Sequence, residues 1–193
     1  MPSSVRSLTG VSRFFRLLAI VAVFVVGGAA CSSDPSSGSS DPTGGATDAD
    51  QAQTSLDAGL KAHAAGHLPA AAELYEETLD LDPTNQYAFY NLALIDEAAG
   101  NYGLAEDNYR SALDTDEEYG PALFNLAILR TAADDPEEAI SLYQRAVAVD
   151  RKDAAAWLNL GLLLRDAGQE RAGNEDVLRA LALDPSLEDP ADG

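Results

Sequence analysis

The sequence of 193 residues contains one cysteine, two histidines and few basic residues. A single cysteine excludes an internal disulfide bond. The histidines, His63 and His67, lie four residues apart and fit one helix face, but no third ligand of the metal-binding kind is evident near them. Because a stable site needs more than two protein ligands, we expect no metal site.

Basic side chains are scarce. Only 12 lysines and arginines stand against 32 aspartates and glutamates, which gives a net charge of -20. A surface of this charge repels nucleic acid phosphates and anionic lipid headgroups, so we expect no nucleic acid partner. The charge favours a basic protein partner, or it serves only to keep the protein in solution.

Sequence motifs of common catalytic sites are also missing. We find no glycine-rich phosphate loop, no HExxH, no Cys/His nucleophile pair and no GxSxG. The acidic run at 114–118 lacks the full pattern of a calcium-binding EF-hand loop. We therefore expect that the protein is not an enzyme and needs no cofactor.

Residues 1–30 have the layout of a secretory signal peptide. Three arginines and no acidic residue come first, followed by an apolar run from Leu17 to Val26 and small residues up to Ala30. The stretch from Leu17 to Ala30 has 14 residues. A membrane-spanning helix needs about 20, so cleavage before Cys31 is favoured over an uncleaved anchor.

The cleavage site resembles that of a bacterial lipoprotein, in which the cysteine becomes the first mature residue and carries the lipid. Ala29, Ala30 and Cys31 fit this pattern, whereas Gly28 stands where the family usually has leucine. The resemblance implies an exported protein that is lipidated at Cys31 and anchored to the extracytoplasmic side of a bacterial membrane. Gly28 and Ala30 also fit ordinary signal cleavage, so plain secretion is an alternative.

A flexible tether is expected at residues 31–51. Residues 32–50 consist mainly of serine, glycine, aspartate, proline and threonine, with no aromatic or large aliphatic side chain. Such a segment cannot bury enough apolar surface to offset the entropy lost on ordering. Placed after a lipid, it would hold a domain away from the membrane.

Residues 52–187 repeat with a period of 34, in units at 52–85, 86–119, 120–153 and 154–187, which leaves a tail at 188–193. Small residues recur at the eighth and twentieth places of each unit, where they let two helices approach closely. They are Gly59, Ala93, Ala127 and Gly161, and Ala71, Ala105, Ala139 and Gly173. The twenty-fourth place holds Tyr75, Tyr109, Tyr143 and, in the last unit, Val177.

This pattern resembles the tetratricopeptide repeat family, whose units also have this length. The departures are Ser55, where the family has a bulky residue, Val177, and Glu117 and Arg151 in place of a closing proline. The resemblance implies an all-α fold: a right-handed solenoid of four helix-turn-helix repeats with a concave groove.

Turn signals predict the helix bounds. Gly66, Gly100 and Gly168 suit the positive φ at the end of a helix, and Asp134 takes their place in the third unit. The segment 135–138 predicts an N-cap, a first-turn proline and a capping box. We expect helices at 53–65, 69–81, 86–99, 103–115, 120–132, 136–149, 154–167 and 170–183.

The resemblance also implies a binding site, because in this family the first helix of each pair lines the concave face. Asn91, Asn125 and Asn159 recur there at a spacing of 34. The row resembles the asparagine ladder of superhelical tetratricopeptide proteins, which holds an extended peptide by its backbone. An amide can donate to a peptide carbonyl and accept from a peptide N–H. The alternative is that these asparagines bond only to neighbouring turns of the solenoid.

Apolar residues flank the asparagine row, and such a strip usually marks a binding site when it is exposed. We expect them to form the groove floor, the alternative being that some belong to the core. They are Tyr90, Phe124, Leu158, Leu94, Ile128 and Leu162, with Leu56 and Leu60 in the first unit, and Tyr87, His63, Glu97 and Arg165 are placed to rim them. Some family members clamp a C-terminal carboxylate, but only Asn91 matches that pattern, so we expect no such clamp.

The sequence thus predicts an adaptor or scaffold that binds a peptide segment of another exported or membrane protein in its groove. The alternative is a structural envelope protein that assembles with itself. That alternative rests on the apolar edge of the last helix, Val177, Leu178 and Leu181, which could form a homodimer.

Overall fold

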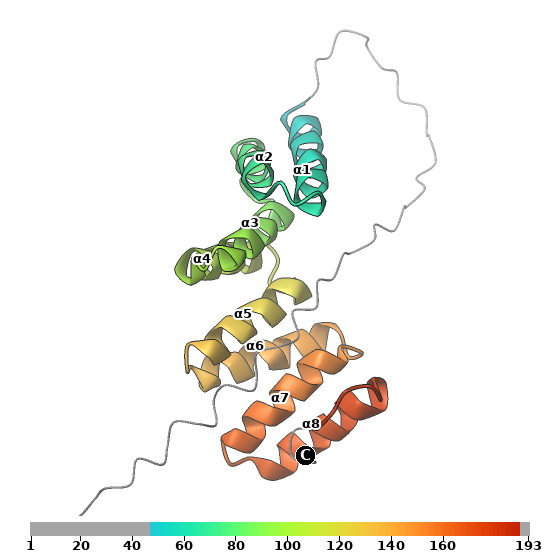
Figure 1. Cartoon of the computed structure of the whole chain (residues 1–193). Coiled ribbons are helices and arrows are strands. Elements are labelled where there is room, and N and C mark those ends of the chain that lie inside the picture. Colours follow the sequence, from blue (N-terminus) through green and yellow to red (C-terminus); the bar gives the residue numbers. More distant parts are fainter. Residues whose placement is uncertain (1–46, 190–193) are drawn as a thin grey trace, which may run out of the picture. The chain divides into compact units, whose positions relative to one another are not determined.

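The computed structural model describes residues 47–189, so the predicted signal peptide, Cys31 and most of the predicted tether lie outside the described residues. Within this range the chain forms helices and no strand (Figure 1). The helices are α1 (Asp48–Ala64), α2 (Leu68–Leu81), α3 (Gln86–Ala98), α4 (Tyr102–Thr115), α5 (Gly120–Ala132), α6 (Pro136–Val149), α7 (Ala154–Asp166) and α8 (Glu170–Leu183).

The predicted bounds agree with these helices to within one residue, except at the start of α1. This helix begins at Asp48, so the predicted end of the tether at residue 51 is wrong. The cause is a capping box. The Asp50 N–H donates to the Thr47 hydroxyl oxygen at 3.2 Å, and the Thr47 N–H donates to the Asp50 carboxylate at 3.1 Å. Both bonds satisfy N–H groups that would otherwise have no partner at a helix start.

The helices pack as four hairpins in chain order, and the second helix of each hairpin packs on the first helix of the next (Figure 1). Small residues at the crossing points make this packing possible. Ala93 and Ala105 are fully buried in the second hairpin, as are Ala127 and Ala139 in the third. The predicted all-α solenoid of helical hairpins is confirmed.

The turn inside each hairpin uses a left-handed residue, as predicted. Gly66, Gly100 and Gly168 have φ values of 78°, 79° and 78°, and Asp134 has a φ of 61°. This conformation lets the chain leave the helix while its last carbonyls are still bonded. Aspartate is one of the few other residues that adopt it at small cost.

The predicted capping box of α6 is only half formed. The Glu138 N–H donates to the Asp135 carboxylate at 3.2 Å. The Glu138 carboxylate does not return the bond but accepts one from Arg110 at 2.7 Å and lies 3.3 Å from Nε of Arg130. Two guanidinium groups are stronger partners for a carboxylate than one backbone N–H, because charge-assisted bonds are the strong ones.

Candidate functional site

The three predicted asparagines lie on α3, α5 and α7, the first helices of their hairpins, and all are half-buried. We call the side of α1, α3, α5 and α7 that carries them and their flanking apolar residues the asparagine face. The apolar members are also half-buried, with three exceptions. Leu60 is exposed at 42%, whereas Leu56 and Leu158 are buried at 4% and 8% and belong to the core.

Asn125 bonds within the array. Its amide nitrogen lies 3.2 Å from the hydroxyl of Tyr90 and 3.3 Å from the hydroxyl of Tyr109, and it donates to both. The Tyr109 hydroxyl in turn donates to the Glu97 carboxylate at 2.9 Å. Burial raises the pKa of Tyr109, and the negative charge of Glu97 raises it further, so this tyrosine stays a donor. The network joins the second and third hairpins.

The fourth hairpin repeats this arrangement in a simpler form, because Asn159 donates to the hydroxyl of Tyr143 at 3.2 Å. Asn91 differs and donates to the backbone carbonyl of Tyr87 at 2.7 Å. Each amide nitrogen therefore has a partner inside the solenoid, as the structural alternative expects. Within residues 47–189 the three amide oxygens accept no hydrogen bond, so they remain able to accept one from a peptide N–H.

In the first hairpin His63 stands at the place that Glu97 holds in the second and contacts the tyrosine of its own hairpin. The Nδ1 atom of His63 lies 3.3 Å from the hydroxyl of Tyr75. Burial raises the pKa of Tyr75 to about 12. Burial also lowers the pKa of His63, because the charged imidazole is harder to desolvate than the neutral one.

An aromatic cluster lies on the same face at the second hairpin. Tyr119 packs edge-on against Tyr87, with ring centres 5.7 Å apart, and against Tyr90, with ring centres 5.4 Å apart. Tyr87 is 48% exposed. We did not predict Tyr119 from the sequence. Its position in the sequence could have indicated it, because Tyr119 is the last residue of the second unit and directly precedes α5, the first helix of the third hairpin.

Charged side chains lock the second hairpin to the third away from this face. Arg130 of α5 contacts Glu106 of α4 at 2.6 Å, and Arg110 of α4 contacts Glu106 at 3.0 Å and Glu138 of α6 at 2.7 Å. These acids and bases satisfy one another, so we assign the cluster a structural role.

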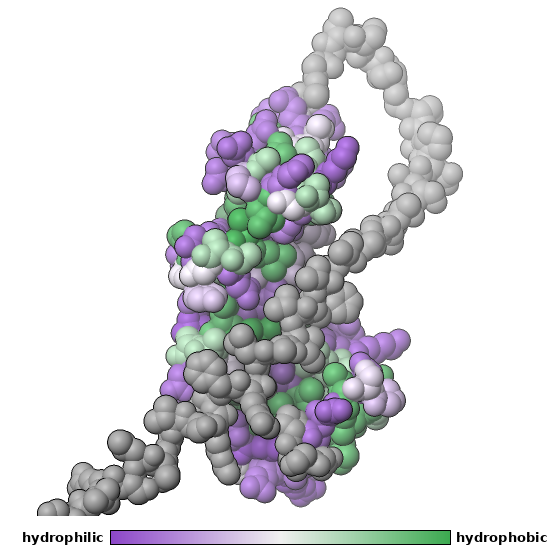
Figure 2. All heavy atoms as spheres, in the orientation of Figure 1, coloured by the Kyte–Doolittle hydropathy of each residue, from purple (hydrophilic) through white to green (hydrophobic). Residues whose placement is uncertain are grey.

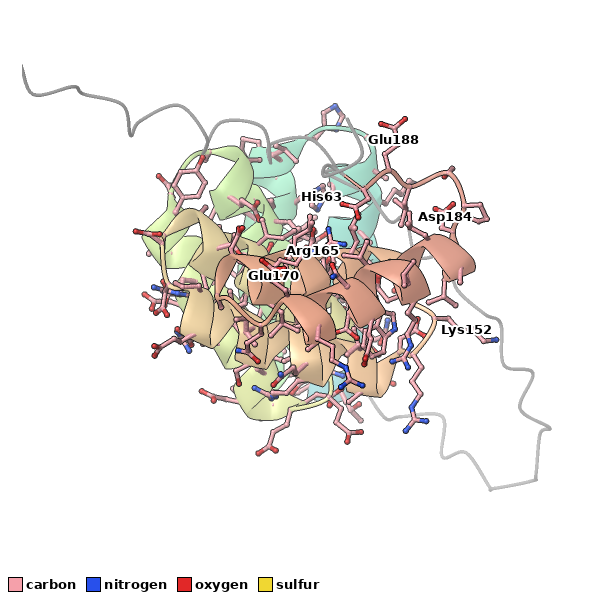
Figure 3. All side chains as sticks on the ribbon, turned by 90° about the horizontal axis from the view of Figure 1, so that it is seen from below. His63, Lys152, Arg165, Glu170, Asp184 and Glu188 are labelled. Atoms are coloured by element: carbon pink, nitrogen blue, oxygen red, sulfur yellow. The ribbon has the colours of Figure 1, made fainter. Side chains whose placement is uncertain are left out.

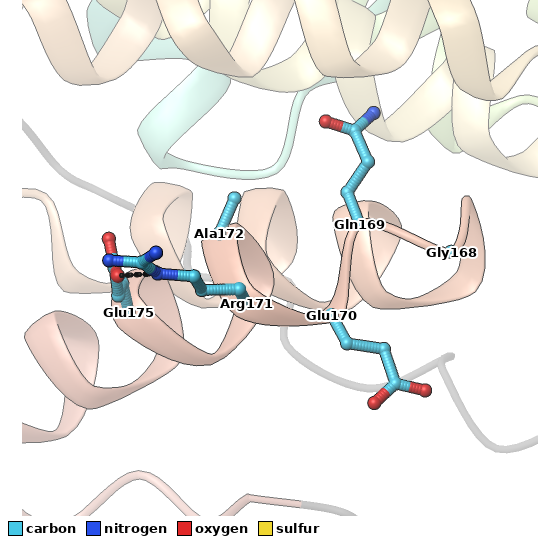
Figure 4. A pocket seen from close by; sticks show the side chains of 6 residues that line it. All are labelled: Gly168, Gln169, Glu170, Arg171, Ala172 and Glu175. Carbon is cyan, nitrogen blue, oxygen red and sulfur yellow. Dashed lines mark hydrogen bonds and ion pairs between the residues drawn. The ribbon is translucent and has the colours of Figure 1, made fainter.

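Shallow hollows open at the turns of the second and fourth hairpins, lined by residues 100–107 and 168–175. In Figure 4 Gln169 and Glu170 point in different directions, and Arg171 pairs with Glu175. The side chains drawn around this hollow do not converge on a common point. Across residues 47–189 no group of three or more histidine, cysteine, aspartate or glutamate side chains is placed to hold a metal ion. None of the described helices is long and apolar enough to cross a membrane.

The predicted edge for self-assembly on α8 is mostly buried. Val177 is completely buried beneath α7, so its predicted place on an exposed edge is wrong. Leu181 packs partly against the same core, and only Leu178 is largely exposed, at 66%. On the side seen in Figure 2, hydrophobic residues gather in patches between hydrophilic ones.

Comparison with known proteins yields one family and several structures. The model of the cilia and flagella-associated protein 70 middle TPR-like domain matches residues 58–180. A search of curated proteins finds no match. A crystal structure of MamA has a TM-score of 0.62 and 21% identity, covering 70% of this chain and 79% of MamA.

Two further structures resemble the array. YrrB, described as a TPR protein with an unusual peptide-binding site, has a TM-score of 0.64 and 22% identity, covering 69% of each chain. The first TPR of Spaghetti (RPAP3), bound to the HSP90 peptide SRMEEVD, has a TM-score of 0.58 and 22% identity. That comparison covers 63% of this chain and 97% of the other. At these identities the likeness establishes the fold alone.

Proposed function

Because the chain belongs to the family of the cilia and flagella-associated protein 70 middle TPR-like domain, we propose that it is a protein-interaction adaptor that binds a peptide segment of another protein on its asparagine face. The observation that carries the proposal is the apolar surface of this face. Leu60 on α1 and Tyr87 on α3 are 42% and 48% exposed there, and Tyr90 and Phe124 on the same face are half-buried. Exposed apolar side chains gathered on one face usually mark an interaction site.

The asparagine oxygens support the same site. Asn91, Asn125 and Asn159 have acceptor atoms that no described residue uses, and a peptide backbone supplies the matching donors. Two structures of the same fold add support by analogy, since YrrB is described as having a peptide-binding site and Spaghetti (RPAP3) was solved with a bound peptide.

The proposed location is the extracytoplasmic side of a bacterial membrane, where a lipid on Cys31 holds the array through a tether. The support is the sequence pattern of residues 1–31, with its basic start, short apolar run and lone cysteine. Secretion after ordinary cleavage is the alternative.

The test is site-specific photocrosslinking with a matched pair of tyrosines. A photoreactive phenylalanine analogue replaces either Tyr87 on α3, exposed at 48%, or Tyr102 on α4, exposed at 61%. Tyr102 is the control because it is at least as exposed but lies on the second helix of the same hairpin. We expect one defined crosslinked protein from position 87 and none from position 102. Equal crosslinking at both positions would contradict binding on the asparagine face.

A second candidate function, self-assembly, is favoured only by Leu178, which is 66% exposed on α8. Light scattering of residues 47–193 separates the two candidates. A dimer that Leu178→Ser converts to a monomer supports self-assembly, whereas a monomer at all concentrations supports the adaptor.

A further inference from the structure

The segment that follows α8 folds back onto α7 and is held there by an ion pair. Two guanidinium nitrogens of Arg165 donate to the two carboxylate oxygens of Asp189, at 2.7 Å and 2.8 Å. The Asp189 side chain is only 9% exposed and that of Arg165 only 20%. A bidentate pair with this little solvent contact is both strong and geometrically selective.

An apolar contact precedes the ion pair by two residues. Leu187 packs against the cluster of Leu158, Val177 and Ala180. A turn presents it, because the Asp184 carboxylate accepts hydrogen bonds from the N–H and the hydroxyl of Ser186, at 2.9 Å and 2.7 Å. The segment 184–189 thus reaches α7 with one apolar and one acidic side chain.

The surface that receives this segment is part of the asparagine face. Leu158, Leu162 and Arg165 are spaced by four and three residues on α7, so they share one side of the helix. In Figure 3 Arg165 lies over the middle of the array, whereas Glu188 lies at its edge and points outward. The segment therefore lies where the fourth hairpin would contribute to a peptide site.

Arg165 reaches this segment because the fourth hairpin lacks the tyrosine of the others. At the equivalent place His63 contacts Tyr75 and Glu97 accepts from Tyr109, each within its own hairpin. Val177 has no hydroxyl to offer. The Nε atom of Arg165 donates instead to Asn174 at 2.6 Å, which aims the rest of the guanidinium at Asp189.

We propose that Arg165 and the apolar cluster beside it form a peptide subsite for an apolar residue followed two positions later by a carboxylate, and that residues 184–189 occupy this subsite as an internal competitor. The inference rests on the proposed protein-binding function and specifies its partner. A partner segment of this chemistry must displace the chain's own segment, so its apparent association constant equals the intrinsic one multiplied by the fraction of molecules in which the subsite is open.

The test supplies the segment as a separate molecule. The probe is a fluorescein-labelled synthetic peptide with the sequence of residues 183–190, titrated by fluorescence anisotropy at about 0.15 M salt, where the repulsion between two acidic molecules is screened. The proteins are the unaltered full chain, Asp189→Asn, the double variant Leu187→Ser/Asp189→Asn and the control Glu188→Gln. Glu188 carries the same charge one residue away, is exposed, and forms no ion pair within residues 47–189.

We expect the double variant to bind the peptide at least about tenfold more tightly than the unaltered chain, because its own segment no longer competes. Asp189→Asn should lie between them, and Glu188→Gln should match the unaltered chain. A peptide with asparagine at the place of Asp189 should not bind. The single tryptophan, Trp157, packs against the same apolar cluster, so its emission should report release of the segment.

Three outcomes of these titrations would contradict the proposal. If the double variant keeps its circular-dichroism spectrum but does not bind the peptide, the segment is only a structural cap and the proposal is overturned. Equal binding by all four proteins overturns the competition. Arg165→Lys in the double variant should weaken binding, because lysine keeps the charge but loses the two-pronged geometry; unchanged binding would also contradict the proposal. None of these results alters the photocrosslinking test at Tyr87, which lies on a different hairpin.

Discussion

Gly161 is the residue whose substitution most directly tests the packing of the fourth hairpin. A Cβ atom at this position would lie 2.7 Å from the Gly173 carbonyl oxygen, 2.9 Å from the Val177 nitrogen and 2.8 Å from a Val177 methyl group. Two of these three atoms are backbone, which cannot rotate away. The Gly161→Ala variant must therefore push α7 and α8 apart.

The cost can be bounded by two opposing effects. Overpacking of a close contact costs about 1–3 kcal/mol. Replacing glycine with alanine within a helix raises the free energy of unfolding by about 0.5–1 kcal/mol. We place the net loss at about 1–2 kcal/mol, because the contacts with backbone atoms put the strain in the upper part of its range. At roughly 2–4 °C per kcal/mol for a domain of this size, the Tm should fall by roughly 2–8 °C.

The assay is a thermal melt followed by circular dichroism, with Gly103→Ala as the matched control. Gly103 also lies in a helix, but a Cβ atom there would meet nothing within 4 Å. The control should be neutral or slightly more stable than the unaltered chain. Hydrogen exchange should quicken in α7 and α8 before α1 and α2, because stability in such arrays is coupled between neighbours. A Gly161→Ala protein as stable as the control would refute the close approach of the two helices.

Other variants test other parts of the chain. Asn125→Ala should destabilise the array by about 0.5–1.5 kcal/mol, since it removes donors to two tyrosines, whereas Asn91→Ala should be nearly neutral; urea titration compares them. Burial lowers the pKa of His63 below 6.5 in the folded chain. As the pH falls, His63 is therefore protonated in the unfolded chain at a higher pH than in the folded chain. Stability should therefore decline as the pH falls below about 6.5, and His63→Asn should flatten that decline in melts at stepped pH. Cys31→Ser should abolish labelling by a fatty-acid analogue in cells that export the protein, and persistent labelling would place the lipid elsewhere.

The helices could be predicted from the sequence because the same physical constraints recur in every unit. A hairpin needs small residues where its helices cross and a left-handed residue where the chain turns, and both recur at a spacing of 34. Gly66 and Asp134 marked their turns even though their side chains differ, because both tolerate a positive φ. Because four units share the pattern, a departure in one unit does not change the predicted helices.

The partners of individual side chains could not be predicted in this way. Glu138 fits a capping box by spacing, yet the structure pairs it with arginines from two other helices. The three asparagines lie on the first helices of the second, third and fourth hairpins. The bonds of Asn125 and Asn159 to tyrosine hydroxyls depend on how neighbouring hairpins meet. Such contacts arise from packing across units, which periodicity alone does not describe.

Three features set the fourth hairpin apart from the other hairpins, and they follow from one another. Gly161 and Gly173 bring α7 and α8 closer than a methyl group would allow. The narrower gap holds Val177 where the earlier hairpins hold tyrosine. Without a hydroxyl to bond, Arg165 turns to Asp189 and fixes the segment after α8. Stacking of repeats requires only that each repeat packs on its neighbours in the same way. Residues that depart from the common pattern together in one repeat therefore indicate a function of that repeat, and we expect specificity for a partner to reside first in the fourth hairpin.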